Sequence, residues 1–119
     1  MRYIFTFMSG LIFFKTEKMG AMEDFYGNRI GMDEWLRQSD CVILKHDNLL
    51  LGFCQRDESD RQGIITFYFE TNREVDSFYE KFKEEALGPP KLNEKYNIYH
   101  FFCEDPEGRM VEFQRFLDL

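Results

Sequence analysis

Ile64-Ile65-Thr66-Phe67 is a short apolar run of the kind found in β-strands, and Phe78-Tyr79 follows it in a helix-like stretch. The same arrangement occurs earlier in the chain, where Leu11-Ile12-Phe13-Phe14 precedes Phe25-Tyr26. Leu11 to Ile64 and Phe25 to Phe78 are both 53 positions apart. An internal repeat of this length indicates two copies of one supersecondary unit, so we expect two similar modules.

A polar segment separates the two copies. Residues 57–63 read Asp-Glu-Ser-Asp-Arg-Gln-Gly, a composition typical of an exposed loop, and we assign this segment no chemistry. The expected organisation is one domain with a first module at about 9–56, this linker, and a second module at about 64–116. Residues 1–8 are an N-terminal extension that either lengthens the first strand or packs as an arm on a partner subunit.

Each module is expected to fold as a βαβββ unit. In the first we expect strands at 9–15, 34–38, 41–45 and 49–55 and a helix at 18–29; in the second, strands at 64–70, 96–103 and 109–116 and a helix at 73–86, capped by Thr71 or Asn72. Two such units predict an α+β fold, a curved mixed sheet with one helix on one face of each half. The other faces are expected to close around a shared cavity.

Composition limits the function. Among 119 residues, 44% are apolar and 14 are Phe, which favours a Phe-rich core over an aromatic pocket, although both readings stay open. The net charge of −7 argues against a nucleic-acid partner, since phosphate binding needs clustered Lys and Arg. The same charge fits a cationic ligand and plain solubility equally well.

The cysteines and the N-terminus bear on location. Cys41, Cys54 and Cys103 are scattered and odd in number, which is typical of reduced, buried thiols in a cytoplasmic protein. The apolar run from Tyr3 to Phe14 is interrupted by polar residues, lacks a cleavage site and is too short to span a bilayer. We therefore expect a strand there, a cytoplasmic location and no membrane partner.

One stretch near the C-terminus combines an aromatic residue, a DPxG turn and a Glu four residues after the Gly. It reads Phe102-Cys103-Glu104-Asp105-Pro106-Glu107-Gly108-Arg109-Met110-Val111-Glu112-Phe113. It resembles the closing hairpin of the vicinal-oxygen-chelate superfamily, which includes glyoxalases, bleomycin resistance proteins and dioxygenases. The segment from Met19 to Met32 is similar to that superfamily's first helix and following turn. With the repeat, the resemblance covers residues 9–116 and implies the same two-module fold.

The resemblance also implies where a metal would bind. Enzymes of the superfamily usually chelate a divalent cation, and the matching first-strand positions here hold Leu11 and Ile64. The position that closes the first module falls near Leu50 or Gly52, so only Glu112 keeps a ligand side chain. One carboxylate does not make a transition-metal site, so we expect no metal cofactor and disfavour a divalent metal.

Strand alternation selects the candidate ligand-binding residues. If Leu11 and Ile64 face the cavity, Phe13, Thr66 and Tyr68 do so as well; Met110 and Gln114 share the face of Glu112, and His100 shares that of Phe102. In related fosfomycin-resistance proteins, an aromatic residue at the position of Phe102 faces the ligand. The expected ligand-binding residues are Phe13, Thr66, Tyr68, His100, Phe102 and Glu112.

Each candidate also has a structural interpretation. Phe13 and Phe102 could be core residues, Tyr68 could lie at a rim, and His100 could be purely structural. Glu112 could pair with Arg109 or Lys15 or face water, because a carboxylate in an apolar cavity needs a partner. We expect Trp35 in the core.

The sequence favours a binding protein over an enzyme: a metal-free protein that holds a small aromatic or cationic molecule in an aromatic-lined cavity. The alternative is a metal-dependent lyase, transferase or dioxygenase of the same superfamily, in which His46 or His100 joins Glu112 as a displaced ligand. A third interpretation, a module that binds a protein or senses a ligand, has no positive support. The resemblance implies a homodimer.

Overall fold

The computed structural model describes residues 7–119, which form two compact units, one up to Asp60 and one from Arg61 onward. The prediction for the N-terminal extension falls mostly on residues 1–6, outside the described residues. Phe7 and Met8 are exposed and precede the first strand. Within residues 7–119, no helix is both long and apolar enough to cross a bilayer.

The first unit contains the predicted strands and helical segment. Its elements are β1 (Gly10–Thr16), α1 (Met19–Met22), η1 (Glu23–Ile30), β2 (Asp33–Arg37), β3 (Cys41–His46) and β4 (Leu49–Gln55). The strands form one sheet in the order β1-β4-β3-β2, with β1 parallel to β4 and the other pairs antiparallel. The helical segment is α-helical for one turn and then continues as a π-helix that ends at Gly31, where φ is 105°.

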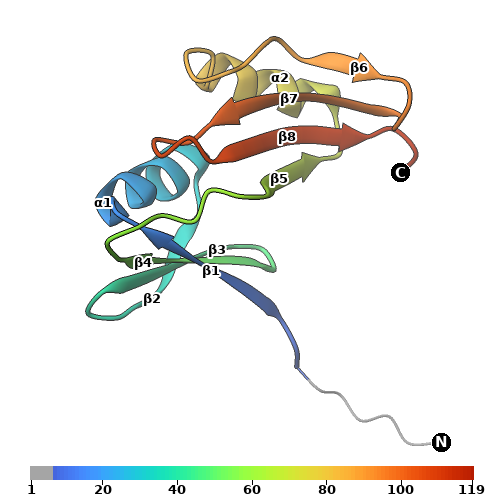
Figure 1. The fold of residues 1–119 in the computed structure, drawn as a ribbon. Helices are drawn as coiled ribbons and strands as arrows, with labels where there is room; N and C mark the ends of the chain where they lie inside the picture. The colour runs from blue at the N-terminus through green and yellow to red at the C-terminus, as the bar shows by residue number, and fades with distance from the viewer. Residues whose placement is uncertain (1–6) are drawn as a thin grey trace, which may run out of the picture. The chain divides into compact units, whose positions relative to one another are not determined.

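The helical segment of this unit lies over one face of its sheet (Figure 1), and aromatic packing joins the two. The ring of Tyr26 stacks on Phe53 of β4 with 4.9 Å between centroids, and Phe14 of β1 stacks on Phe53 at 5.7 Å. Because side chains alternate along a strand, Phe13 is left on the opposite face. Trp35 is 54% exposed, so the prediction that it lies in the core is wrong. The strand β2 is exposed along its whole length, which leaves this ring at the surface.

The second unit repeats the plan. Its elements are β5 (Ile64–Phe69), α2 (Asn72–Lys81), β6 (Lys91–Asn93), β7 (Ile98–Glu104) and β8 (Met110–Phe116), with strand order β5-β8-β7-β6. Thr71 caps α2 by accepting a hydrogen bond from the backbone N–H of Glu74 at 3.2 Å. The helix ends five residues before its predicted end at Ala86, because Ala86 forms a bridge with Cys103 of β7 and the backbone N–H of Leu87 donates to Phe102.

Phe113 of β8 is the centre of the core in the second unit. Its ring contacts Phe78 of α2 and Phe82, the residue after the helix, at 5.1 and 5.5 Å between centroids, and it is fully buried. Three further rings from the sheet, those of Phe67, Phe69 and Phe101, stack against it. The Phe-rich composition is therefore used largely for a core, as the commoner interpretation held.

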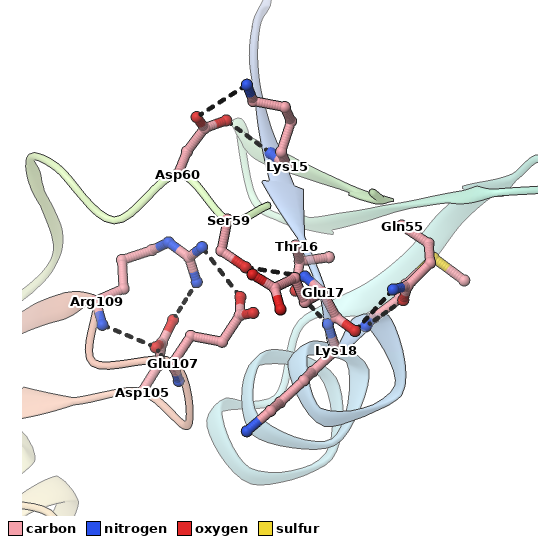
Figure 2. Close-up of polar contacts among 11 residues, drawn as sticks. Lys15, Thr16, Glu17, Lys18, Gln55, Ser59, Asp60, Asp105, Glu107 and Arg109 are labelled. Atoms are coloured by element: carbon pink, nitrogen blue, oxygen red, sulfur yellow. Dashed lines mark hydrogen bonds and ion pairs between the residues drawn. The ribbon is translucent and has the colours of Figure 1, made fainter. Parts of the chain in front are cut away.

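A buried ion pair closes the turn between β7 and β8. The guanidinium of the fully buried Arg109 donates to Asp105 at 2.6 Å and to Glu107 at 3.2 Å (Figure 2). The other oxygen of Asp105 accepts the backbone N–H groups of Glu107 and Arg109 at 2.9 and 3.0 Å. Arg109 therefore pairs with two carboxylates of this turn, whereas Glu112 has other partners.

The first half of the linker is attached to the end of β1. Asp60 accepts the backbone N–H of Lys15 at 2.7 Å, and the hydroxyl of Ser59 accepts that of Glu17 at 2.9 Å (Figure 2). The ammonium of Lys15 pairs with Glu58 and with Asp60. These hydrogen bonds fix the local conformation of a segment that the sequence presents only as a polar loop.

The cysteine prediction is wrong for two of the three residues. Cys41 of β3 and Cys54 of β4 lie directly opposite each other, with 4.1 Å between their Cα atoms, and form a disulfide. Cys103 is a buried thiol, as expected. Scattered spacing in sequence gave no sign that two cysteines would face each other across a strand pair. The cytoplasmic location, which relied on reduced thiols, stays a prediction.

Replacing Asp105 by Asn should destabilise the second unit strongly. The substitution keeps the shape but leaves the buried guanidinium of Arg109 without its closest counter-charge, which typically costs about 3–5 kcal/mol. Urea unfolding followed by circular dichroism measures the change. Glu58→Gln, which removes an exposed pair, is the matched control and should move the midpoint little. Equal effects of the two substitutions would contradict a structural role for the buried pair.

Reduction of the Cys41–Cys54 disulfide should lower the free energy of unfolding by about 3 kcal/mol, because a cross-link over a loop of this size restricts the unfolded chain. Urea unfolding with and without dithiothreitol measures the difference. In the Cys41→Ser/Cys54→Ser double variant, the reductant should have no effect. Three reactive thiols in the unfolded, unreduced protein would show that the disulfide is absent.

Candidate functional site

The sheet face opposite α2 carries the candidate site, and we call it the far face. Phe113 and Phe101 point to the helix, so their neighbours along β8 and β7 point away from it. The strand register places two adjacent rows of three residues on the far face: Thr66, Glu112 and Phe102, then Tyr68, Gln114 and His100. Five of the six predicted ligand-binding residues therefore lie together on one face of the second unit.

Glu112 lies at the centre of this arrangement and has two hydrogen-bond partners. Its Oε1 accepts from the hydroxyl of Thr66 at 2.9 Å, and its Oε2 lies 2.7 Å from Nδ1 of His100. Glu112 and His100 are 8% and 5% exposed, so both are well shielded from solvent. A buried carboxylate needs such partners, and here they are Thr66 and His100, not Arg109 or Lys15, which were considered as alternatives.

The contact with Glu112 fixes the chemistry of the imidazole. With Glu112 ionised, the carboxylate only accepts hydrogen bonds, so Nδ1 of His100 carries the hydrogen; in the neutral ring Nε2 is then an acceptor. Within residues 7–119, Nε2 has no hydrogen-bond partner, and it is not among the fully enclosed atoms. The ring of Phe102 meets the imidazole edge to face at 5.1 Å, which further restricts its orientation.

Gln114 is the polar neighbour of His100 in the same row. It is only 6% exposed, yet its carboxamide makes no hydrogen bond to any residue in the described part of the chain. Its amide atoms are not among the fully enclosed atoms, so a molecule of the size of water can reach them. Buried amides are normally satisfied, so this carboxamide is a position where a bound water or a ligand can supply the missing hydrogen bond.

Aromatic rings border these polar groups. Tyr68 is 66% exposed and meets Phe116 edge to face at 5.9 Å, in agreement with a rim position. A pocket of about 340 Å³ in this unit is lined by Tyr68, Phe69, Glu70, Phe116 and Leu119. This pocket adjoins the site through Tyr68 but does not include His100 or Glu112, so we do not identify it with the candidate site.

The sixth predicted residue, Phe13, belongs to the first unit. It lies on the sheet face opposite the helical segment, and its ring covers Gly52, where an added Cβ would come within 2.5 Å of a ring carbon. The ring is half-exposed, so Phe13 is not a core residue. The shared cavity between the modules stays a prediction, as does a ligand-binding role for Phe13.

The donor set does not fit the metal site that the superfamily resemblance implies. Thr66, not Ile64, lies opposite Glu112, whereas Ile64 lies opposite Met110. The position equivalent to Thr66 in the first module is Phe13, which cannot ligate. Among residues 7–119 there is no group of three or more His, Cys, Asp and Glu side chains that could hold a metal ion.

The sequence did not reveal the short strand β6, which places Lys91 opposite His100. Three residues that follow two prolines carry too little alternation to indicate a strand. His46, the other histidine considered as a displaced ligand, lies at the end of β3 in the first unit and is exposed.

No protein-family model matches this sequence, and no curated protein matches it either. Solved structures do. A glyoxalase/bleomycin resistance protein/dioxygenase from Alicyclobacillus acidocaldarius superposes with a TM-score of 0.76 at 18% identity, over 93% of this chain and 92% of that one. A glyoxalase/bleomycin resistance protein/dioxygenase family enzyme from Burkholderia phytofirmans PsJN gives 0.78 at 18% identity, over 90% and 97%.

A lactoylglutathione lyase from Agrobacterium tumefaciens gives a TM-score of 0.71 at 20% identity, over 92% of each chain. Sequence identities this low establish the fold and leave the activity open. The order of elements, the two four-stranded mixed sheets and these similarities agree with one another. The chain therefore has the glyoxalase/bleomycin resistance/dioxygenase fold of the vicinal-oxygen-chelate superfamily, as its closing hairpin and internal repeat predicted.

Proposed function

We propose that this protein binds a small, flat aromatic molecule against the far face of the second unit without a metal ion. The observation that carries the proposal is the pairing of a shielded His100–Glu112 contact with a buried Gln114 carboxamide that has no hydrogen-bond partner among residues 7–119. Small-molecule sites commonly combine a few oriented polar groups with aromatic and apolar walls. Phe102 and Tyr68 supply such walls.

The hydrogen-bond partners of Glu112 favour a neutral ligand over a cationic one. Both of its oxygens already accept hydrogen bonds, from Thr66 and from His100. A cationic group would have to share this carboxylate, whereas Nε2 of His100 and the Gln114 amide need no rearrangement to bind a ligand. We therefore favour a neutral aromatic ligand over the cationic one that the net charge also allowed.

A metal-dependent enzyme of the same fold is the alternative function. The observation in its favour is that His100 and Glu112, two residue types that bind metals, are in contact. Against it, their contact uses Nδ1 of the ring and one carboxylate oxygen, and no third ligand lies near them in the described residues. Most catalytic metal sites need three protein ligands.

A panel of flat aromatic compounds at about 1 mM should contain members that raise the melting temperature, since a ligand that binds only the folded state stabilises it. For each such compound, calorimetric titration should show about tenfold weaker binding to Gln114→Leu, because one hydrogen bond to the ligand is lost. Gln62→Leu, in the exposed linker, is the matched control and should bind like the unmodified protein.

Elemental analysis of protein purified without a histidine tag accompanies this titration. If no compound of the panel raises the melting temperature and the protein contains stoichiometric Ni, Zn, Mn or Fe, the metal-dependent alternative would replace the binding proposal. Equal affinities for Gln114→Leu and Gln62→Leu would show that ligands bind elsewhere.

We also propose that the protein is a homodimer, as the resemblance implies. Light scattering at tens of micromolar should then give twice the chain mass of 14.4 kDa. A monomeric mass that persists as the concentration rises would contradict this expectation.

A further inference from the structure

We infer that the group recognised by this site is a hydroxyl on the aromatic ligand, an inference that rests on the proposed function. The chemical class follows from what His100 and Gln114 can offer together. Nδ1 of His100 lies 2.7 Å from Oε2 of Glu112; with the carboxylate ionised and the ring neutral, the hydrogen is on Nδ1 and Nε2 is a hydrogen-bond acceptor. The ligand must therefore present a donor to Nε2.

The orientation of the imidazole is fixed by its surroundings. Thr66 donates to the second oxygen of Glu112 at 2.9 Å, so the carboxylate is held from the side away from His100. Phe102 packs against the ring edge to face at 5.1 Å. A donor on the ligand thus meets an acceptor whose direction is set before binding, which lowers the entropic cost of recognition.

Gln114 supplies the complementary group. Gln114 and His100 are directly opposite each other on β8 and β7, so their Cβ atoms are separated by about 5 Å and one small group can contact both side chains. The carboxamide N–H donates hydrogen bonds, and it has no acceptor among residues 7–119. The ligand atom that donates to Nε2 can satisfy this N–H if it also carries a lone pair.

An aryl hydroxyl is the simplest group that meets both conditions. It donates its hydrogen to Nε2 of His100 and accepts from the Gln114 amide through the same oxygen. A carbonyl or an ether cannot donate, and the nitrogen of an aryl amine is a poor acceptor because its lone pair is delocalised into the ring. A site built in this way rejects analogues without the hydroxyl, because its buried polar groups are then left unpaired.

Three matched coumarins test the inference: 7-hydroxy-4-methylcoumarin, its 7-methoxy analogue and its 7-amino analogue, titrated by fluorescence. The hydroxy compound should bind about tenfold or more tightly than either analogue. His100→Leu should abolish this preference, whereas His46→Leu, which changes an exposed histidine of the first unit, should leave it intact. Equal binding of the three compounds to the unmodified protein would overturn the inference.

The role of Glu112 as a positioning residue has its own readout. In unmodified protein labelled with ¹⁵N at histidine, the NMR spectrum should show the tautomer of His100 with the hydrogen on Nδ1. Glu112→Gln can donate to Nδ1, so it should move the hydrogen to Nε2 and remove the preference for the hydroxyl. A hydrogen already on Nε2 in the unmodified protein would overturn the inference whatever the affinities are.

The outcomes also separate the two proposals. If none of the coumarins binds while other aromatics in the panel do, the hydroxyl assignment is wrong and the binding proposal stands. If no compound of the panel binds, the binding proposal fails and the assignment fails with it.

Discussion

The packing of Phe113 is the constraint on which the second unit depends. Its ring lies among five others, those of Phe78 in α2, Phe82 just after the helix and three strand residues, so the orientation of β8 about its own axis is fixed. Since side chains alternate, Glu112 and Gln114 must then point away from the helix. A shift of β8 by one residue would bury the polar side chains of Glu112 and Gln114 in a Phe core. The packing of the hydrophobic core therefore also determines which face of the sheet carries the polar site.

Much of this fold could be predicted from the sequence because its signals are local or periodic. The repeat at a spacing of 53 residues and the turn at Asp105 each need only a few neighbouring residues to be recognised. Alternation also placed Thr66, His100 and Glu112 on one face. Alternation could not predict that Thr66 contacts Glu112, because this contact depends on which residue of β5 lies opposite which residue of β8. That register placed Thr66, not Ile64, beside Glu112.

The remaining errors share a physical cause. The Cys41–Cys54 disulfide, the early end of α2 and the strand β6 all depend on partners distant in sequence. Trp35 was placed in the core on residue type alone, whereas an exposed strand leaves its ring at the surface. Local propensity describes what a segment prefers by itself, and tertiary contacts decide between preferences that differ by little.

The close approach of Phe13 to Gly52 has a consequence for how this family of sequences can change. With no side chain at Gly52, the aromatic ring lies directly on the neighbouring strand, and even a methyl group there would overlap it. The two positions are therefore coupled: a larger residue at position 52 requires the ring of Phe13 to turn away or position 13 to become smaller. Among related sequences, glycine at one position and an aromatic residue at the other should be gained and lost together.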